Sequence, residues 1–367
     1  MASAAPRIDV ETPALLLDLG VVERNLAHMA ERARRLGVAL RPHIKTHKCV
    51  ELGRRQLAHG AAGITVSTLA EAEAFARAGF TDLTWAFPLD PTHIPHVRRI
   101  AERVTLRVVV DDLSTAKALA RTGLHVWLKV DCGYHRAGVD PASQYALEVA
   151  RELAREQGLV FDGILSHSGH AYRTRNQAEA AEVAEQERQV MVWFADLLRR
   201  GGVPVRGVSV GSTPAMAAVR DLTGVTEARP GNYIFYDRTM VLIGCCGRDD
   251  VGVTVLATVV SYQPGAAHFV VDAGALALSK DVGPTHLDLP PTMGEVRGHP
   301  DLTVASVSQE HGIIRSAGPD ALDGRFRVGD RVEIVPNHSC LTMAHFDEYV
   351  VIEEGRVIDR WRIERAR

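Results

Sequence analysis

The sequence predicts an α/β protein, a (β/α)8 barrel of the TIM type together with an all-β domain. In the first two thirds of the 367-residue chain, eight short apolar runs alternate with longer helical patterns. Such alternation is typical of parallel strands joined by helical crossovers, and eight units suit a closed barrel. After about Cys245 the apolar runs continue without a long helix, which predicts the β domain. A doubly wound open sheet is the alternative to the barrel.

The predicted barrel strands follow one another at regular intervals: Val38–Lys45, Gly63–Ser67, Asp82–Leu89, Leu106–Asp111, His125–Asp131, Phe161–Ser168, Gly207–Gly211 and Val225–Arg229. Apolar residues at helical spacing fill most of the intervals, as in Pro141–Gln157 and Ala178–Arg199. A further run, Ala14–Leu19, would be a ninth strand, so we assign it to the second domain. The predicted domains are therefore a barrel over residues 20–244 and a β domain formed by residues 1–19 and 245–367.

The β domain is predicted from short runs separated by turn residues: Val251–Tyr262, His268–Asp272, Thr303–Gln309, Arg331–Ile334, Tyr349–Glu353 and Val357–Arg362. The formal net charge of −3 gives no electrostatic reason to expect nucleic acid or an anionic membrane as a partner. No apolar run could span a bilayer, and the N-terminus lacks the apolar core of a signal peptide. The five cysteines are few, and their number is odd, so they do not indicate a disulfide framework. We therefore expect a cytoplasmic protein.

The segment RPHIKTHK, residues 41–48, closes the first predicted barrel strand. The carboxyl ends of barrel strands are where such enzymes carry their functional groups. Partial burial lowers the pKa of a lysine amine because desolvation penalises the cation, and an amine of that kind can form a Schiff base. Lys45 is therefore a candidate for a catalytic lysine. A solvated lysine in a loop is the alternative.

A phosphate site is predicted after the seventh barrel strand. Gly211, Ser212 and Thr213 supply backbone N–H groups and hydroxyls in front of a predicted helix, and phosphate sites recur after strands seven and eight of barrels. The segment from Arg229 to Tyr233 after the eighth strand would complete the cradle. The alternative is a serine or threonine that caps an ordinary helix.

His338 and Cys340 are the candidate metal ligands. If the chain stays extended after Pro336, side chains two residues apart point to the same side. An imidazole and a thiolate suit Zn²⁺, and only two protein ligands would leave positions open for water and substrate. We expect Zn²⁺, with Mn²⁺ or Mg²⁺ as alternatives. A His-x-Cys motif alone is also compatible with an unrelated histidine and free thiol.

Six segments together resemble the D-serine dehydratase and D-threonine aldolase family: ETPALLLD (11–18), RPHIKTHK (41–48), SHSGH (166–170), GSTP (211–214), EARPGNY (227–233) and PNHSC (336–340). They occur in order and cover nearly the whole chain. The resemblance implies an alanine-racemase-like barrel with a β domain that includes the first strand. It also implies pyridoxal 5′-phosphate (PLP) on Lys45, and a head-to-tail homodimer in which the β domain of one chain closes the barrel site of the other.

The resemblance also bears on the remaining site residues. The positions of His338 and Cys340 match a zinc-binding pair of the dehydratases, whereas the aldolases carry an aspartate at the second position. Cys340 therefore favours a dehydratase. His167, Tyr172 and Tyr233 are expected to bind the cofactor, with Tyr172 also acting on the substrate or relaying a proton. Arg136 is expected near the cofactor or the substrate carboxylate; a surface ion pair is its alternative, and a packed loop aromatic is that of Tyr172.

The expected function is that of a PLP- and metal-dependent lyase acting on β-hydroxy D-amino acids. Lys45 would take the Cα proton, and the metal would assist departure of the β-hydroxyl. D-Serine would give pyruvate and ammonia. The alternatives are a D-threonine aldolase, which would release glycine and acetaldehyde, and a 3-hydroxy-D-aspartate dehydratase or aldolase. An amino-acid racemase and a non-catalytic PLP carrier are alternatives of other classes.

Overall fold

A computed structural model describes residues 8–364 apart from 156–157, 317–321 and 323. The chain divides into two compact units. One is the barrel unit, Ala27–Gly231, and the other, the β unit, combines the chain before Ala27 with the chain from Asn232 onwards. Helix α1 (Leu19–Arg35) crosses the division at Ala27.

The described strands of the barrel unit form one eight-stranded parallel sheet, in the order β2-β9-β8-β7-β6-β5-β4-β3. Its ends meet, because the Thr65 amide donates to the Pro42 carbonyl oxygen and a parallel bridge joins His43 to Thr65. The predicted barrel is therefore confirmed. The strands are β2 (Ala39–Leu40), β3 (Ile64–Val66), β4 (Asp82–Pro88), β5 (Thr105–Val110), β6 (His125–Lys129), β7 (Val160–Leu165), β8 (Gly207–Val210) and β9 (Glu227–Ala228).

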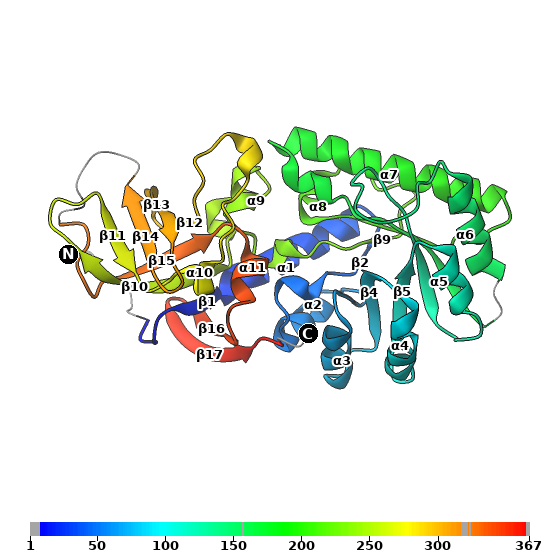
Figure 1. The fold of residues 1–367 in the computed structure, drawn as a ribbon, viewed down its shortest axis with the longest axis horizontal. Coiled ribbons are helices and arrows are strands. Elements are labelled where there is room, and N and C mark those ends of the chain that lie inside the picture. The colour runs from blue at the N-terminus through cyan, green and yellow to red at the C-terminus, as the bar shows by residue number, and fades with distance from the viewer. Residues whose placement is uncertain (1–7, 156–157, 317–321, 323, 365–367) are drawn as a thin grey trace. The chain divides into compact units, whose positions relative to one another are not determined.

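Helices connect the parallel strands and lie outside them (Figure 1). Side chains of Thr68, Asp112 and Asn176 cap the first turns of α3, α5 and α7, as preferred N-cap residues do. The predicted helix Pro141–Gln157 is observed as α6, and its residues 156–157 lie outside the described part. The bounds are α2 (Val50–Ala58), α3 (Leu69–Arg77), α4 (Ile94–Ala101), α5 (Leu113–Ala118), α6 (Gln144–Arg155), α7 (Gln177–Arg200) and α8 (Thr213–Ala218).

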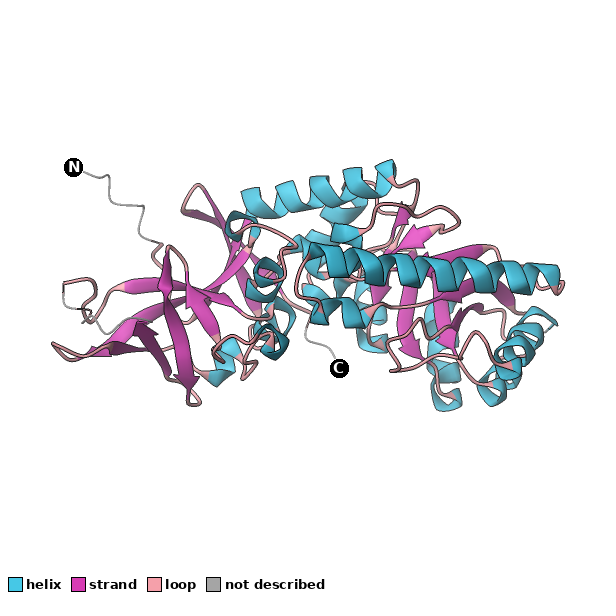
Figure 2. Cartoon of the chain, turned by 90° about the horizontal axis from the view of Figure 1, so that it is seen from above, coloured by secondary structure: helices cyan, strands magenta, loops and turns pink. Residues whose placement is uncertain are grey.

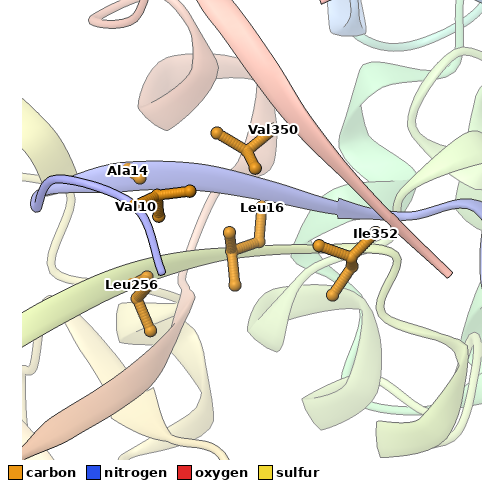
Figure 3. Close-up of a cluster of buried hydrophobic side chains, with 6 residues drawn as sticks. All are labelled: Val10, Ala14, Leu16, Leu256, Val350 and Ile352. Carbon is orange, nitrogen blue, oxygen red and sulfur yellow. The ribbon is translucent and has the colours of Figure 1, made fainter. Parts of the chain in front are cut away.

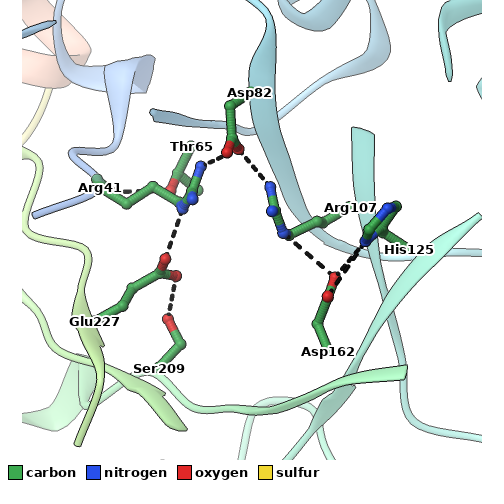
Figure 4. Close-up of polar contacts among 8 residues, drawn as sticks. All are labelled: Arg41, Thr65, Asp82, Arg107, His125, Asp162, Ser209 and Glu227. Atoms are coloured by element: carbon green, nitrogen blue, oxygen red, sulfur yellow. Dashed lines mark hydrogen bonds and ion pairs between the residues drawn. The ribbon is translucent and has the colours of Figure 1, made fainter. Parts of the chain in front are cut away.

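A partly buried ionic network ties the barrel strands together (Figure 4). The Arg41 guanidinium, only 4% exposed, donates through Nε to Glu227 of β9 at 2.7 Å and through Nη1 to Asp82 of β4. Arg107 of β5 donates to the same Asp82 carboxylate. The Thr65 hydroxyl donates to the Arg41 carbonyl oxygen at 3.0 Å. Arg41 thus anchors the end of β2, from which the chain continues into the turn that carries Lys45.

The β unit contains a nine-stranded sheet in its described part, with the order β11-β14-β13-β12-β15-β10-β1-β16-β17. Strand β11 also pairs with β10, which closes an antiparallel barrel. The strands are β1 (Ala14–Asp18), β10 (Val253–Tyr262), β11 (His268–Val271), β12 (Gly294–Val296), β13 (His299–Val307), β14 (Gly312–Ser316), β15 (Arg331–Pro336), β16 (Glu348–Glu353) and β17 (Arg356–Arg362). Short helices α9 (Arg238–Leu242), α10 (Ala275–Leu278) and α11 (Ser339–Met343) complete the unit, in which Figure 2 shows mostly strands.

The N-terminal strand belongs to the β sheet, as the sequence predicted. Strand β1 pairs antiparallel with β10 and parallel with β16. Its buried side chains pack with those of both neighbours in one apolar cluster (Figure 3): Val10, Ala14, Leu16, Leu256, Val350 and Ile352. Strands β12 and β14 were not predicted, because β12 has three residues and β14 contains only two apolar residues, Ile313 and Ile314.

None of the helices in the described part of the chain combines the length and the apolar character needed to cross a membrane.

Candidate active site

A cavity of about 360 Å³ opens in the barrel unit where the strands end. Lys45 follows β2, Lys129 ends β6, His167 follows β7, and Gly211 follows β8. The carboxyl ends of parallel barrel strands converge on one face, which explains why residues so distant in sequence meet there. The lining residues are His43, Lys45, Ser67, Ala86, Phe87, Pro88, Lys129, Arg136, Ala137, Leu165, His167, Gly211 and Arg229.

The ionisable residues that line this cavity are all basic: His43, Lys45, Lys129, Arg136, His167 and Arg229. Burial, together with the neighbouring guanidinium of Arg229, lowers the pKa of Lys129 to about 8. Burial and the nearby Lys45 hold the pKa values of His43 and His167 well below the usual range of histidine, so both are neutral at pH 7. Cations gathered without a carboxylate in the lining suit an anionic ligand. This donor set therefore fits a phosphate-bearing cofactor.

Lys45 lies in a 3₁₀ turn, Ile44–Thr46, and not on the predicted strand Val38–Lys45. The strand ends at Leu40, and Pro42 then has no N–H to continue a ladder. The His43 ring caps the turn by accepting from the Lys45 amide at 3.4 Å. The half-buried side chain of Lys45 is thus held at the cavity by a short turn.

His47 fixes the far end of that turn. Its Nδ1 accepts from the Cys49 amide at 3.1 Å, so the ring proton is on Nε2, which donates to Gln56 Oε1 at 3.2 Å. Burial lowers the pKa of His47 to about 4. The neighbouring Lys48, at φ +46°, reaches Glu71 Oε1 at 3.3 Å. Both contacts brace the segment that carries Lys45 against helices α2 and α3.

The predicted phosphate turn adopts a tight conformation at the start of α8. Gly211 lines the cavity with φ +105°, a backbone region that favours glycine. Ser212 is the N-cap of α8, and its hydroxyl accepts from the Ala215 amide at 3.4 Å. The capping role that was the alternative for Ser212 is therefore present. Ser212 and Thr213 are both buried.

Two of the other predicted residues line the cavity. The Nδ1–H of His167 donates to the Gly211 carbonyl oxygen at 3.3 Å, which links the loops after β7 and β8. The Arg136 guanidinium lies 5.0 Å from the centre of the Tyr134 ring, and that ring meets His167 edge-on. Tyr172, in the 3₁₀ turn Gly169–Arg173, is not among the lining residues described above.

Three predicted residues belong to the β unit: Tyr233, His338 and Cys340. Tyr233 is fully buried in a 3₁₀ turn, Asn232–Ile234. His338 and Cys340 do not lie on an extended segment, which corrects the sequence-based expectation. His338 is the extended N-cap residue of α11, and Cys340 is already in its first turn, because the chain turns helical at Ser339.

The side chains of His338 and Cys340 nevertheless meet. Burial acts to lower the pKa of His338, but the hydrogen-bonded Cys340 and the Asp281 and Asp237 carboxylates raise it to about 11. Asp281 Oδ2 lies 3.4 Å from His338 Nδ1. Within the described residues, no group of three or more His, Cys, Asp or Glu side chains is arranged to hold a metal. A histidine and a cysteine are ligands of the kinds that bind Zn²⁺, and each would give up a proton to a metal bound here.

Sequence reasoning left His43 and Lys129 out of the predicted site residues, and it named Arg229 only as the start of the segment that would complete the phosphate cradle. All three lie at or just beyond the end of an observed strand, β2, β6 or β9, so the rule that found Lys45 could also have found them once the strand ends were known. Arg229 is 5% exposed and donates to the Ser166 carbonyl oxygen and the Ser209 hydroxyl. It supplies a second buried cation at the cavity.

Comparisons with known proteins cover both units. Residues 17–239 match the alanine racemase N-terminal domain, and residues 252–352 match a serine dehydratase domain. A D-threo-3-hydroxyaspartate dehydratase from Delftia sp. (strain HT23) is 37% identical over 96% of this chain and 97% of its own length. This chain belongs to the D-serine dehydratase and D-threonine aldolase family. The resemblance drawn from the sequence is therefore confirmed.

Two further relatives have different reactions in their names. A D-serine dehydratase from Dictyostelium discoideum is 37% identical over 95% of each chain. A D-threonine aldolase from Arthrobacter sp. is 34% identical over 98% of this chain and 93% of its own length. The relatives are lyases, and their families together with the alanine-racemase-like fold imply PLP as the cofactor.

Two solved structures of a D-threo-3-hydroxyaspartate dehydratase, each 37% identical, match with TM-scores of 0.93. They cover 97% of this chain and 98% and 95% of their own chains. One is a cysteine-to-alanine variant in the metal-free form, and the other is a histidine-to-alanine variant. The two substituted positions are two residues apart in that enzyme, which is the spacing of His338 and Cys340.

Proposed function

We propose that this protein is a PLP- and metal-dependent dehydratase of small β-hydroxy D-amino acids, with D-serine as the first candidate substrate. The observation that carries the proposal is a barrel cavity whose ionisable lining residues, Lys45 among them, are all basic, in a chain of this family. Because the Delftia relative is named for D-threo-3-hydroxyaspartate, that dicarboxylic substrate is the second candidate.

The barrel cavity would hold the cofactor. Lys45 would carry it as a Schiff base, and Gly211, Ser212 and Thr213 would face its phosphate. His167, held by its hydrogen bond to Gly211, and the cations Lys129 and Arg229 would offset its negative charge. PLP supplies an electron sink for the charge that develops at Cα. Tyr172 and Tyr233 remain proposed cofactor-binding residues on the family resemblance.

The proton chemistry would belong to Lys45. Its ε-amine would take the Cα proton from the side of the cavity on which the turn holds it. Arg136, with its guanidinium held over the Tyr134 ring, would bind the substrate carboxylate. Tyr172 would contact the substrate from the loop after β7.

His338 and Cys340 would hold the metal, which we propose to be Zn²⁺ rather than Mn²⁺ or Mg²⁺. A Lewis acid bound there would supply stabilisation of the departing β-hydroxyl. The metal-free state of the cysteine variant of the relative supports this pair as the ligands. The family pattern of cysteine in place of aspartate favours elimination over retro-aldol cleavage. On the same resemblance we propose a homodimer. We also propose a cytoplasmic location, which is supported by the five cysteines because none of them forms a disulfide in the described part of the chain.

Product analysis tests this function. Purified protein with PLP and Zn²⁺ is given D-serine, D-threo-3-hydroxyaspartate or D-threonine, and keto acid, ammonia and glycine are measured. Pyruvate and ammonia from D-serine, lost on chelation and absent with L-serine, are expected. Glycine and acetaldehyde from D-threonine in place of keto acids would identify an aldolase. Formation of the L-enantiomer without ammonia would identify a racemase. The absence of any product from every substrate would indicate a non-catalytic PLP carrier.

A further inference from the structure

The side chain of Glu187 joins three loops at the edge of the barrel cavity. Glu187 lies within helix α7 and is 1% exposed. Its Oε1 accepts from the Ser166 hydroxyl at 2.7 Å, from the Gly211 amide at 3.2 Å and from the Cys132 thiol at 3.8 Å. Its Oε2 accepts from the Ser168 hydroxyl at 2.6 Å. One buried carboxylate thus receives hydrogen bonds from the loops after β6, β7 and β8.

These three loops carry several of the residues that line the cavity. Arg136 follows Cys132, His167 stands between Ser166 and Ser168, and Gly211 leads into the predicted phosphate turn. The Ser166 carbonyl oxygen also accepts from Arg229. A shift of Glu187 would therefore move the side of the cavity that is formed by Arg136, His167 and Gly211. The loops after β2, β3 and β4 would stay in place.

The carboxylate also fixes the direction of a hydrogen-bond chain. Ser168 gives its only hydroxyl proton to Glu187, so the Ser212 hydroxyl, 3.3 Å away, must donate to Ser168. Ser212 in turn accepts from the Ala215 amide. The Ser212 hydroxyl proton therefore points into the protein interior, and its position depends on Glu187.

Glu187 makes these contacts without belonging to the cavity lining. Its nearby negative charge raises the pKa values of Lys129 and Arg229, against the larger lowering caused by burial. Burying a carboxylate is costly unless its oxygens are hydrogen-bonded, and here four donors satisfy them. A buried carboxylate with four donors is expected where the loops that carry those donors must be held in fixed positions.

We propose that Glu187 is a positioning residue that holds the loops after β6, β7 and β8 so that the turn formed by residues 211–213 can bind a phosphate group. This proposal rests on the proposed function, because the phosphate in question is that of the cofactor. Glu187 acts through Ser166, Ser168 and Gly211 and does not touch the cofactor itself.

The test compares binding of PLP with binding of pyridoxal, which lacks the phosphate. The dissociation constant of pyridoxal divided by that of PLP, both measured by absorbance titration, reports how much the phosphate contributes to binding. Glu187→Asp keeps the charge but withdraws both oxygens by one methylene, and should lower this ratio about tenfold, since one strained charge-assisted contact is worth about that much. Glu187→Gln keeps an acceptor for Ser166 and Gly211, and its NH₂ can donate to Ser168. The proton of Ser168 then turns to Ser212, so the three loops stay joined although the direction of this one hydrogen bond reverses. Glu187→Gln should therefore leave the ratio within about threefold of wild type.

Glu71→Asp is the matched control. Glu71 is a fully buried carboxylate of α3 that accepts from the Ser67 amide and hydroxyl, in the loop after β3. Shortening it should lower the melting temperature without changing the ratio. A wild-type ratio in Glu187→Asp, equal loss of both ligands, or loss in Glu187→Gln but not in Glu187→Asp would each overturn the positioning role. If wild-type protein forms no Schiff base with either aldehyde, the proposed function itself fails.

Discussion

Acid should destabilise this protein through His47, which cannot accept a proton without losing a hydrogen bond. Its Nδ1 already accepts from the Cys49 amide, and its Nε2–H donates to Gln56. Protonation of Nδ1 would place two N–H groups face to face in a site with no exposed surface. Burial therefore lowers the pKa of His47 from 6.5 to about 4 in the folded protein.

The sign and size of the change in stability with pH follow from the difference between the pKa of His47 in the unfolded and in the folded protein. Below pH 6.5 the unfolded chain binds a proton at His47 that the folded protein does not bind, so stability is lost as the pH falls towards 4. Each pH unit within this window costs about 1.4 kcal/mol. At pH 5 the free energy of unfolding should be lower by about 2 kcal/mol than at pH 8 because of His47 alone.

Urea unfolding of the wild type and of His47→Asn at pH 8 and pH 5 measures this contribution. The asparagine oxygen can accept from the Cys49 amide but does not titrate. His43 and His167, whose pKa values are also lowered, remain in both proteins, so their contributions cancel. The loss of stability between pH 8 and pH 5 should be smaller in His47→Asn by about 2 kcal/mol. Equal losses in the two proteins would refute the reasoning.

The other predictions concern the site. Borohydride should fix PLP on Lys45, and Lys45→Ala should abolish the adduct and the visible absorbance; a peptide map that places the adduct on Lys129 would contradict the assignment. Chelation should remove dehydratase activity while circular dichroism and bound cofactor stay unchanged, and unaffected turnover would exclude a metal at the His338 pair. Cys340→Asp should shift metal preference towards Mn²⁺ or Mg²⁺ and raise aldolase activity relative to elimination, measured as glycine against keto acid. Gly169→Ala should lower the melting temperature, because its Cβ would clash with the Tyr134 ring, and an unchanged melting temperature would mean that the ring moves freely.

The eight barrel strands could be predicted because the runs that contain them are mostly apolar and largely buried, as is typical of parallel strands with both faces covered. The β unit was harder. Strands such as Val253–Tyr262 were found, whereas Gly294–Val296 is too short to show alternation and depends on its neighbours for pairing. The turn that holds Lys45 was predicted as a strand, since periodicity alone does not detect the break that follows Leu40.

The contacts that hold the candidate site together could not be predicted from the sequence, as Glu187 shows. The residues Ala180, Ala184, Glu187, Met191 and Phe194 are spaced as one buried face of α7, and all are buried in the structure. A glutamate in the middle of an apolar stripe is therefore a signal that the sequence does contain, because a buried charge needs partners. The sequence cannot name those partners, since the donors to Glu187 come from loops up to 55 residues away along the chain. Closure of the barrel brings these loops together. Several of the residues that line the cavity can thus be predicted strand by strand, whereas the contacts that hold them in place arise only once the barrel has formed.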